Sequence, residues 1–389
     1  MLKKLINLLK TILVIVFTRR KFNYNTWVFS SSFNTKFNYN SKYLFEHVYN
    51  NEPLISPLYV INDDILRKQL KEKYGEEFFI ETKSFKGIKR VLNAGVWFTS
   101  AGLPSYGLRL NKKRLIINLW HGVPLKKIAL LEEKVSKVNK VYFKYIFSKN
   151  YSFIITTSNK LISVMQKSFG VDKNKIKVLG QPRNDVLYIE KEKKQVLQKL
   201  YSQLPSYTKA ILYAPTYRDN GETVLFPFKD FDMVKLNEFL KKNDMIIFIR
   251  SHQSDNSKVI NFGNRVKFIN EDIEEDIMNI INIFDLLITD YSSIYIDFLL
   301  MNKPIMFLPY DKNQYLEERG FNFNYDDVTP GPKPSNLTEF MDELSLLIKD
   351  KKYYLSDRIK TNNYFNEIKE NSSEKIVVFA KKEIKKLNN

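Results

Sequence analysis

Short apolar runs of strand length alternate with helical stretches along most of this 389-residue chain, and this alternation restricts the fold more than any other feature. Seven such runs precede a polar stretch near residues 190–208, and five follow it. Continuous apolar strands between helices indicate parallel sheets that are covered by helices on both faces. Two series therefore predict an α/β chain with two doubly wound, Rossmann-like domains that meet at a cleft. The expected strands are residues 27–31, 58–61, 78–80, 96–100, 115–119, 153–157 and 175–179, then 210–214, 245–250, 266–269, 286–289 and 305–308.

The N-terminal segment, residues 1–22, is basic and amphipathic. Its first 21 residues contain six Lys or Arg and no acidic residue. Its apolar part is about 13 residues long, shorter than the roughly 20 residues that span a bilayer. No small-residue cleavage site follows it, as a secretory signal would require. We expect a helix in the headgroup layer of a membrane, with an ordinary first helix packed on the protein as the alternative. The two larger domains would then cover residues 23–200 and 201–389.

A second amphipathic stretch follows Pro124. Between residues 126 and 149, seven Lys and two Glu are interleaved with aliphatic and aromatic side chains. Such a stretch forms either a membrane-facing pair of helices or a surface helix with a Lys-rich solvent side.

The formal charge of +19 indicates an anionic partner, although part of it has a simpler origin. Only 12 of the 62 basic residues are Arg, and Asn is abundant, so the chain prefers Lys and Asn throughout. A nucleic-acid-binding protein is the alternative from another class, but no recognition-helix motif is present and we expect no nucleic-acid partner. The absence of cysteine excludes disulfides, thiolate zinc sites, iron–sulfur clusters and cysteine nucleophiles.

The loops after the expected strands carry the functional information, because ligands of doubly wound sheets bind beyond the carboxyl ends of the strands. A histidine imidazole at such a strand end can act as a general base near neutral pH. We favour that role for His121 over the alternative, a histidine that only bonds to backbone. The loop after residues 115–119 reads Trp120, His121, Gly122, Val123, Pro124, Leu125 and Lys126.

Arginine, although scarce, recurs at strand ends and in one later loop. Arg183, Arg218 and Arg250 follow expected strands, and Arg319 lies in a further motif-like loop. The planar guanidinium binds phosphate through two hydrogen bonds at once, which Lys cannot do. We therefore predict phosphate recognition at these positions, with inter-domain ion pairs as the alternative.

The same loops carry further candidate residues, which are Pro215, Thr216, Ser251, His252, Asp290, Ser292 and Ser293. The two adjacent serines precede a helix, whose free N–H groups and dipole favour an anion, although serines there are also ordinary helix caps. Asp297 lies one turn further along the same face and can accept hydrogen bonds from a polyol.

Two common phosphate-binding motifs are missing, the Gly-x-Gly-x-x-Gly dinucleotide loop and the Gly-x-x-x-x-Gly-Lys-Ser/Thr loop. We expect no cofactor and no metal, with Arg, Lys and a helix dipole neutralising the phosphate charge.

At these loops the sequence resembles the CDP-glycerol glycerophosphotransferase family, which builds the poly(glycerol phosphate) chains of teichoic acids. The resemblance follows the family order across roughly half of the chain. The matching segments are residues 120–126, 180–185, 212–219, 250–252, 289–293 with Asp297, 303–311, 319–321 and 330–332.

The resemblance implies a GT-B-like fold of two facing Rossmann-like domains and peripheral attachment to the cytoplasmic face of the cell membrane. The first domain would take the acceptor and the second a CDP-alcohol donor. An acceptor hydroxyl would attack the phosphorus attached to the alcohol, and CMP would leave. His121 matches the proposed base, and His252 is the second catalytic candidate. The expected substrate contacts are Gly122, Val123, Pro124, Leu125, Lys126, Arg183, Pro215, Thr216, Arg218, Arg250, Ser251, Asp290, Ser292, Ser293 and Asp297.

Three positions depart from the family pattern. Val123 replaces the usual Thr, Gln253 replaces a frequent Pro, and residues 39–41 read Tyr-Asn-Ser where the family has Asp-Asn-Pro. The first two bear on the donor loops, and the third bears on which acceptor is used.

We therefore predict transfer of glycerol phosphate, or a related polyol phosphate, to a lipid-linked or polymer acceptor in teichoic-acid or similar envelope synthesis. An anionic membrane surface is the further expected partner. The alternative is a GT-B glycosyltransferase that uses a nucleotide sugar for a capsule or envelope glycan, since one fold serves many substrates. The sequence leaves open the choice of glycerol or ribitol, priming or polymerisation, and the oligomeric state.

Overall fold

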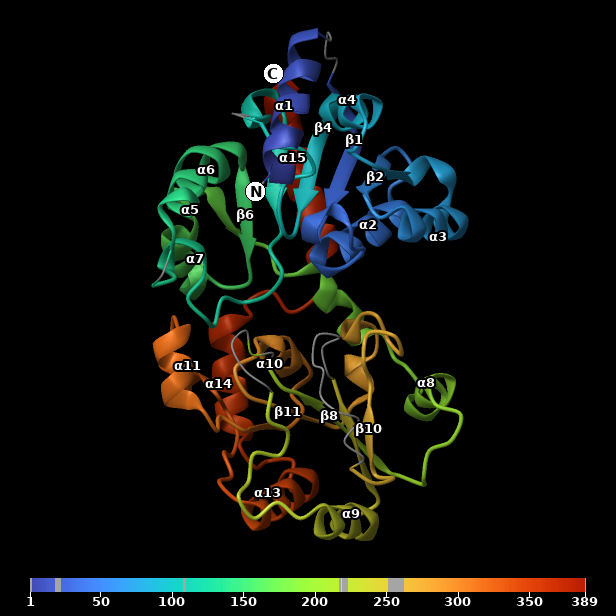
Figure 1. Ribbon diagram of the computed structural model, residues 1–389, viewed down its shortest axis with the longest axis vertical. Helices are drawn as coiled ribbons and strands as arrows, with labels where there is room; N and C mark the ends of the chain where they lie inside the picture. The colour runs from blue at the N-terminus through green and yellow to red at the C-terminus, as the bar shows by residue number, and fades with distance from the viewer. Residues whose placement is uncertain are drawn as a thin grey trace. The chain divides into compact units, whose positions relative to one another are not determined.

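The computed structural model describes residues 2–17, 22–107, 110–133, 135–216, 218, 223–250 and 262–388. The chain divides into two compact units, each built on one sheet (Figure 1). Unit 1 comprises residues 1–122, 128–185 and 367–389, and unit 2 comprises residues 123–127 and 186–366. The second unit therefore begins before the expected boundary at residue 200, and the final segment of the chain belongs to the first unit.

The sheet of unit 1 has seven parallel strands in the order β3-β2-β1-β4-β5-β6-β7. From the β1–β4 pair, the sheet continues through β2 and β3 on one side and through β5, β6 and β7 on the other. The loops that follow β1 and β4 therefore lead to opposite sides. Such a switch point is where ligands of doubly wound sheets bind. The strands are β1 (Asn23–Ser30), β2 (Ser56–Val60), β3 (Phe79–Ile80), β4 (Ala94–Thr99), β5 (Leu115–Asn118), β6 (Phe153–Thr156) and β7 (Ile176–Val178).

One face of this sheet carries an aromatic-rich core. Trp27 and Phe29 of β1 pack beside Phe98 of β4, with the Phe29 and Phe98 rings stacked at 5.3 Å. Helices α2 (Tyr39–Asn51) and α15 (Ser372–Asn388) each contribute three buried apolar residues to the same core. Burial of Ile376 and Ala380 explains why the last helix belongs to unit 1. The remaining helices are α1 (Leu2–Phe17), α3 (Asp64–Tyr74), α4 (Phe85–Asn93), α5 (Lys137–Tyr142), α6 (Ser148–Asn150) and α7 (Ile162–Phe169).

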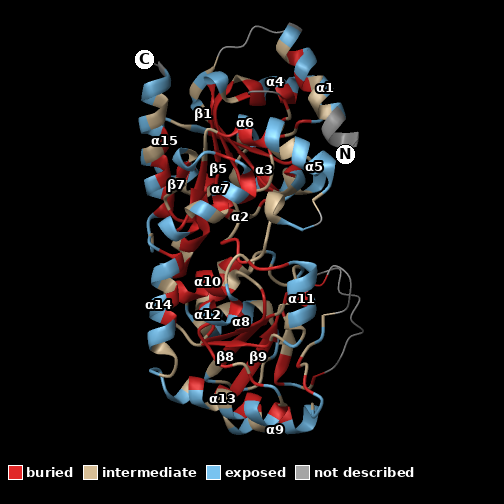
Figure 2. Ribbon diagram, turned by 90° about the vertical axis from the view of Figure 1, so that its left-hand side faces the viewer, coloured by how far each residue is buried: buried red, intermediate tan, exposed pale blue. Residues whose placement is uncertain are grey.

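The sheet of unit 2 has five parallel strands in the order β10-β9-β8-β11-β12, with its switch point between β8 and β11. The strands are β8 (Lys209–Ala214), β9 (Met245–Ile249), β10 (Val266–Phe268), β11 (Leu286–Thr289) and β12 (Ile305–Phe307). The helices are α8 (Lys193–Leu200), α9 (Met233–Lys242), α10 (Ile294–Phe298), α11 (Lys312–Glu318), α12 (Tyr325–Val328), α13 (Leu337–Lys349) and α14 (Leu355–Phe365). Buried strands form the centre of each unit, and the helices present exposed outer sides (Figure 2).

All twelve expected strands are present, and both sheets are parallel as predicted. The largest difference in a strand end is at β1, which begins at Asn23 rather than at residue 27. The additional residues are polar and partly exposed, but Asn23 still pairs with Ala94 of β4. An apolar run alone therefore does not reveal them.

Helix α1 packs on unit 1 through a mixed stripe, in which the apolar Val14 is buried together with polar groups. The Asn7 side chain accepts a hydrogen bond of 2.9 Å from the Tyr106 amide, and the buried Thr11 hydroxyl lies 2.6 Å from that of Ser105. Lys10 donates to the Lys83 carbonyl at 2.6 Å. The opposite stripe is exposed and apolar, and it comprises Ile6, Leu9, Ile12, Leu13 and Val16.

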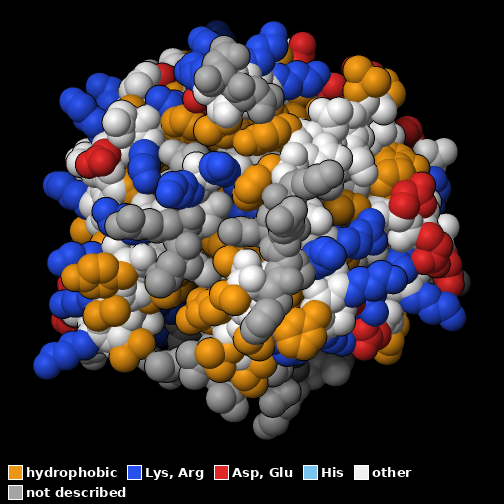
Figure 3. All heavy atoms as spheres, turned by 90° about the horizontal axis from the view of Figure 1, so that it is seen from above, with side chains coloured by type: hydrophobic (Ala, Val, Ile, Leu, Met, Phe, Trp, Pro, Cys, Tyr) orange, Lys and Arg blue, Asp and Glu red, His pale blue; other side chains and the backbone are white. Residues whose placement is uncertain are grey.

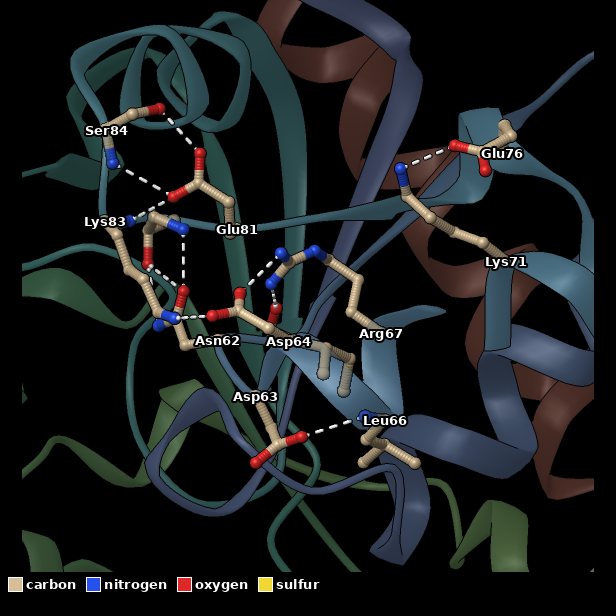
Figure 4. Close-up of polar contacts among 12 residues, drawn as sticks. Asn62, Asp63, Asp64, Leu66, Arg67, Lys71, Glu76, Glu81, Lys83 and Ser84 are labelled. Atoms are coloured by element: carbon tan, nitrogen blue, oxygen red, sulfur yellow. Dashed lines mark hydrogen bonds and ion pairs between the residues drawn. The ribbon is translucent and has the colours of Figure 1, made fainter. Parts of the chain in front are cut away.

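The Lys83 loop that holds α1 is fixed by a network of charged and polar groups at the ends of β2 and β3 (Figure 4). Asp64 accepts hydrogen bonds from Lys83 at 2.8 Å and Arg67 at 2.6 Å, and these two cations lower the pKa of its carboxyl group. Asn62 accepts from the Thr82 amide at 2.7 Å. These ion pairs are exposed, so they orient the loop more than they stabilise the unit.

The basic stretch at 126–149 is more irregular than the pair of helices we considered. Residues 123–127 belong to unit 2, and a short π-helix (Phe143–Phe147) joins α5 to α6. Val138, Val141 and Tyr145 are more than half exposed. Within the described ranges, no helix has the length and apolar character needed to cross a bilayer.

Candidate functional site

His121 follows β5, next to the switch point of the unit 1 sheet. Its Nδ1 lies 2.8 Å from the carbonyl oxygen of Ser100, at the end of β4. A carbonyl can only accept, so Nδ1 carries the proton and Nε2 carries the lone pair. No hydrogen-bond partner of Nε2 is found among the described residues. Gly122 follows with a φ of +146°, a conformation that favours glycine.

The imidazole is held neutral without a carboxylate. Burial is the main cause that lowers the His121 pKa to about 4, and the nearby Arg183 cation lowers it further, against the hydrogen bond to Ser100. Nε2 is consequently unprotonated at neutral pH and available to accept a proton.

Two aromatic rings contact the imidazole. The Tyr39 ring is stacked on it at 4.9 Å with an interplanar angle of 24°, and the Trp120 ring lies 4.1 Å away. Both residues have left-handed backbone conformations, with φ of +58° at Tyr39 and +54° at Trp120. A bulky residue at positive φ is strained, and such strain tends to occur at functional sites.

The completely buried Asn40 organises the loop that carries His121. Its amide donates to the carbonyls of Trp120 at 2.9 Å and Leu119 at 3.2 Å. Its oxygen accepts the Arg183 amide at 3.1 Å. In the sequence, residues 39–41 stand out only as a departure from a family pattern. Sequence alone cannot distinguish an Asn that is buried and bonded to a loop from an ordinary helix residue.

Arg183 lies beside the same loop and donates from Nη1 to the His121 carbonyl at 2.9 Å. Two other residues of the 180–185 segment, Gly180 and Asp185, contact α15. Gly180 has a φ of +83°, and a Cβ there would lie 2.2 Å from the Ser372 hydroxyl. Asp185 accepts the amides of Ser372 and Ser373, both at 2.8 Å, at the start of α15. The phosphate role of Arg183 stays a prediction.

Residues 123–127, which include Val123, Pro124, Leu125 and Lys126, form an extended segment of unit 2. Asn322 secures it, since its amide nitrogen donates to the carbonyls of Pro124 at 2.8 Å and Lys126 at 2.7 Å. The Asn322 N–H donates to the Leu125 carbonyl at 2.9 Å, and Lys127 donates to the Gly320 carbonyl at 3.1 Å. The motif at 319–321 thus lies beside the Val123–Lys127 segment.

Arg218, Asp290 and Asp311 form a buried ion-pair cluster at the β8–β11 switch point. Arg218 donates to Asp290 at 2.9 Å, to Asp311 at 2.8 Å and 3.0 Å, and to the Thr216 carbonyl at 2.6 Å. Asp290 also accepts the amides of Thr216 at 2.8 Å and Tyr291 at 2.5 Å. Arg218 therefore has ion-pair partners, as in the alternative we considered, but they lie in its own unit. Its contact with phosphate stays a prediction.

The other candidates of unit 2 occupy the ends of the same strands. Arg250, after β9, donates from Nη1 to the carbonyls of Ile269 at 3.1 Å and Asn270 at 3.0 Å. Thr216 follows Pro215, and its buried hydroxyl oxygen has no hydrogen-bond partner within the described part of the chain. A bound substrate would satisfy such an atom.

The two serines and the aspartate of the third loop lie around the start of α10. The Ser292 hydroxyl accepts the Ile294 amide at 3.4 Å, and Ser293 is the N-cap residue without a side-chain hydrogen bond. Asp297 is buried within the helix. Ser251 and His252 lie outside the described residues, so the second catalytic candidate stays a prediction.

No cluster of three or more His, Cys, Asp or Glu side chains suited to a metal ion is found in the ranges that the structure describes. The Asp230 and Asp232 carboxylates are both used at helix starts. Asp230 accepts the Leu337 amide at 2.9 Å, and Asp232 accepts the Lys235 amide at 3.0 Å.

A model of the CDP-glycerol:poly(glycerophosphate) glycerophosphotransferase family matches residues 12–380. The chain is 27% identical over 334 residues to a teichoic acid poly(ribitol-phosphate) polymerase of Bacillus spizizenii, covering 82% of this chain and 52% of the relative. It is 28% identical over 291 residues to a teichoic acid glycerol-phosphate transferase of Staphylococcus aureus, covering 72% and 74%. It thus spans about half the length of the first relative and three-quarters of the second.

Among solved structures, the wall teichoic acid polymerase TagF superposes with a TM-score of 0.76 at 24% identity, covering 99% of both chains. This similarity shows the fold and confirms the GT-B-like prediction.

Proposed function

The chain belongs to the CDP-glycerol:poly(glycerophosphate) glycerophosphotransferase family, and from this premise we propose that it transfers a polyol phosphate from a CDP-alcohol. Glycerol phosphate is the favoured group, and a lipid-linked or polymer hydroxyl in teichoic-acid synthesis is the acceptor. The acceptor oxygen forms a bond to the phosphorus attached to the alcohol. The bond from that phosphorus to the bridging oxygen breaks, and CMP leaves with the electron pair.

One observation carries this proposal, namely the hydrogen bond between Nδ1 of His121 and the Ser100 carbonyl. The Ser100 carbonyl fixes the proton on Nδ1, and burial keeps the ring neutral. Nε2 can then take the proton of the acceptor hydroxyl as the new bond forms. Asn40 and the rings of Tyr39 and Trp120 hold the loop and the imidazole plane, so little reorganisation is needed.

Unit 2 supplies groups suited to the donor. The orphaned Thr216 hydroxyl and the serines before α10 lie at the ends of β8 and β11, around the switch point. Lys126, Arg218 and Arg250 supply positive charge. In our proposal these side chains neutralise the diphosphate, and no cofactor or metal takes part. Positioning and electrostatics dominate phosphoryl transfers in general.

The test is to incubate the full chain and a lipid-linked glycerol-phosphate acceptor with CDP-glycerol, CDP-ribitol, UDP-glucose and UDP-N-acetylglucosamine in turn. CMP release coupled to growth of the acceptor by one polyol phosphate is expected with CDP-glycerol. Release of UDP with transfer of a sugar would instead establish the glycosyltransferase alternative. The lengths of the products would separate priming from polymerisation.

We further propose that unit 1 binds the surface of the cell membrane through α1 and α5. Surface helices of globular proteins normally bury their apolar side. Helix α1 does so only in part, because the apolar Val14 is buried beside Thr11 while Leu9 and Val16 are 55% and 67% exposed. Burial of that stripe in the acyl–headgroup boundary would remove it from water.

The charge of this region suits an anionic bilayer. Helix α1 and helix α6, which continues from α5 through the π-helix, contact the same loop, since Asn7 accepts the Tyr106 amide and Asn150 donates to the Gly107 carbonyl at 2.9 Å. Seen from above, the molecule shows more Lys and Arg than Asp and Glu side chains, with apolar groups between them (Figure 3). Each basic group near such a surface adds about 1 kcal/mol of attraction.

Vesicle sedimentation tests this part. The full chain should bind vesicles that contain phosphatidylglycerol more strongly than neutral vesicles, and the paired variant Leu9→Ser with Leu13→Ser should bind at least about 10-fold more weakly. Leu54→Ser, at an 84% exposed apolar residue in the turn before β2, is the matched control. Equal binding by the paired variant and the control would refute this surface.

A further inference from the structure

A hollow of about 700 Å³ lies within unit 2. One wall is formed by the segment with which the chain enters this unit, and it includes Tyr188, Ile189 and Glu190. The facing walls come from Asn282 and from Leu300–Met301, at the end of a short 3₁₀ helix. A volume of this size falls within the range of small-molecule binding sites.

The hollow lies at the amino ends of the strands of unit 2. Asn282 precedes β11 by four residues, and Lys303 precedes β12 by two. Thr216 and Ser292, which we assign to the donor, follow the opposite ends of β8 and β11. Because these strands are parallel and β11 alone has four residues, the two edges are about 13 Å or more apart. The hollow is therefore separate from the proposed donor site.

The nitrogen donors that line the hollow are bonded to the protein itself. The Asn282 side-chain nitrogen donates to the Ile189 carbonyl at 2.7 Å and so ties the entering segment to the unit. Lys303 donates to the backbone carbonyl of Asn282 at 2.5 Å, and Lys191 donates to that of Asn279. These bonds hold the walls in place before any ligand binds.

The acceptors, in contrast, are left without donors. Asn282 Oδ1 is buried and has no hydrogen-bond partner within the described part of the chain. The exposed Glu190 carboxylate likewise forms no hydrogen bond or ion pair with the residues that the structure describes. A buried oxygen without a donor is unfavourable, and a ligand hydroxyl would satisfy it. A ligand of this hollow therefore has to supply hydrogen-bond donors.

Charge and shape restrict the class of ligand further. Two lysines and two glutamates line the hollow, so their charges balance and favour a neutral ligand. A phosphate would compete with the backbone carbonyls for both lysines. Tyr188 is 43% exposed and offers a flat apolar surface. A pyranose ring can stack its C–H face on such a surface while its hydroxyl groups donate to acceptors at the side.

We propose that this hollow binds a neutral pyranose sugar. Tyr188 stacks on the sugar ring, and Glu190 and Asn282 accept hydrogen bonds from its hydroxyl groups. The site lies outside the transfer reaction, so the proposal stands independently of the donor.

Saturation-transfer NMR of the full chain tests the proposal, with methyl β-D-glucopyranoside, N-acetylglucosamine and glycerol as probes. We expect saturable binding of at least one of the two sugars, and glycerol should bind at least about 10-fold more weakly because it has no ring to stack. Excess CDP or inorganic phosphate should not displace the sugar, since neither is expected at this edge of the sheet.

Tyr188→Ala should weaken sugar binding about 10-fold, whereas Tyr188→Phe keeps the ring and should bind normally. Tyr364→Ala, at a 37% exposed tyrosine of α14 in the same unit, is the matched control and should bind normally. Glu190→Ala should weaken binding about 3- to 10-fold, the usual contribution of one hydrogen bond. CMP release from CDP-glycerol should be unchanged in all four variants, because none of these residues belongs to the proposed transfer site.

The proposal is overturned if neither sugar binds, if glycerol binds as tightly as the sugar, or if CDP or phosphate displaces it. Equal sugar affinity of the folded Tyr188→Ala and Tyr364→Ala chains would also overturn it. If Tyr188→Ala fails to fold, Glu190→Ala decides the same point. Sugar binding by a chain that transfers nothing from CDP-glycerol would refute only the proposed reaction, whereas transfer by a chain that binds no sugar would refute only this site.

Discussion

The surroundings of His121 in unit 1 favour a neutral side chain, whereas the cluster around Arg218 in unit 2 favours charged side chains. His121 is surrounded by a carbonyl, a buried amide and two aromatic rings, and within the described residues no carboxylate forms a hydrogen bond with it or stacks on it. Arg218 is paired with two carboxylates. Lys126 lies in the same unit, with its Nζ 5.3 Å from the centroid of the Tyr315 ring.

This difference follows from what each group has to do. A general base must remain neutral, and a low-polarity environment favours the neutral imidazole. A site for a diphosphate needs side chains that stay positively charged when they are buried. Carboxylates hold some of these cations in place, and the other cations can bind the phosphates. Variants of single residues can test each half of the comparison, and we order them from the largest expected effect.

His121→Ala should have the largest effect, a loss of turnover of about 10²–10⁴-fold, which is the usual contribution of general-base catalysis. CMP release from CDP-glycerol is the measurement. The fold should persist, because the imidazole makes one hydrogen bond, to Ser100, and His121 is not part of the apolar core. His47→Ala, in α2, is the matched control and should retain normal turnover. Near-normal turnover by His121→Ala would remove the assigned base.

Arg218→Ala should have the largest effect on stability, because it leaves the buried Asp290 and the neighbouring Asp311 without their shared cation. Breaking a buried ion pair from one side typically costs about 3–5 kcal/mol of unfolding free energy. Denaturant unfolding of the unit 2 transition measures it. Lys83→Ala, which removes an exposed pair with Asp64, should change stability little. Similar small losses for both variants would contradict the buried-cluster interpretation.

The sequence predicted the fold well because the signals of buried parallel strands are local. Apolar runs bounded by turns identify every strand, and the strand ends identify the loops that matter. It could not show that α15 returns to unit 1. That result depends on the long-range packing of Ile376 and Ala380 with strands far earlier in the chain.

The sequence predicted which residues belong to the candidate site, but not the hydrogen bonds and ion pairs that they form with one another. His121, Arg218 and Lys126 were all selected from the sequence. Whether a guanidinium meets a carboxylate or a ligand depends on Asp311, which is 93 residues away along the chain. For the same reason Asn40 was missed, since its partners Trp120 and Arg183 become neighbours only in the folded unit.

Asn40→Asp should lower stability by about 1–3 kcal/mol, the usual cost of unsatisfied buried polar groups. A carboxylate cannot donate to the carbonyls of Leu119 and Trp120, which the Asn40 amide now holds. We also expect kcat to fall more than KM rises, because the loop of the base is displaced. Asn38→Asp is the matched control: its oxygen accepts from Ser31, which a carboxylate can still do. Equal behaviour of the two variants would exclude a positioning role for Asn40.

Tyr39→Ala should give the smallest effect and the most specific one, a change in the pH profile. Because burial holds the His121 pKa near 4, kcat/KM should stay level as the pH falls through 6 and decline only towards that value. Removing the stacked ring admits water, which favours the imidazolium and raises this pKa by about one unit or less. Tyr39→Phe keeps the ring and should keep the profile. NMR titration of the imidazole measures the His121 pKa directly, without turnover. An unchanged His121 pKa in Tyr39→Ala would mean that the buried backbone around Ser100, and not the Tyr39 ring, keeps the base neutral.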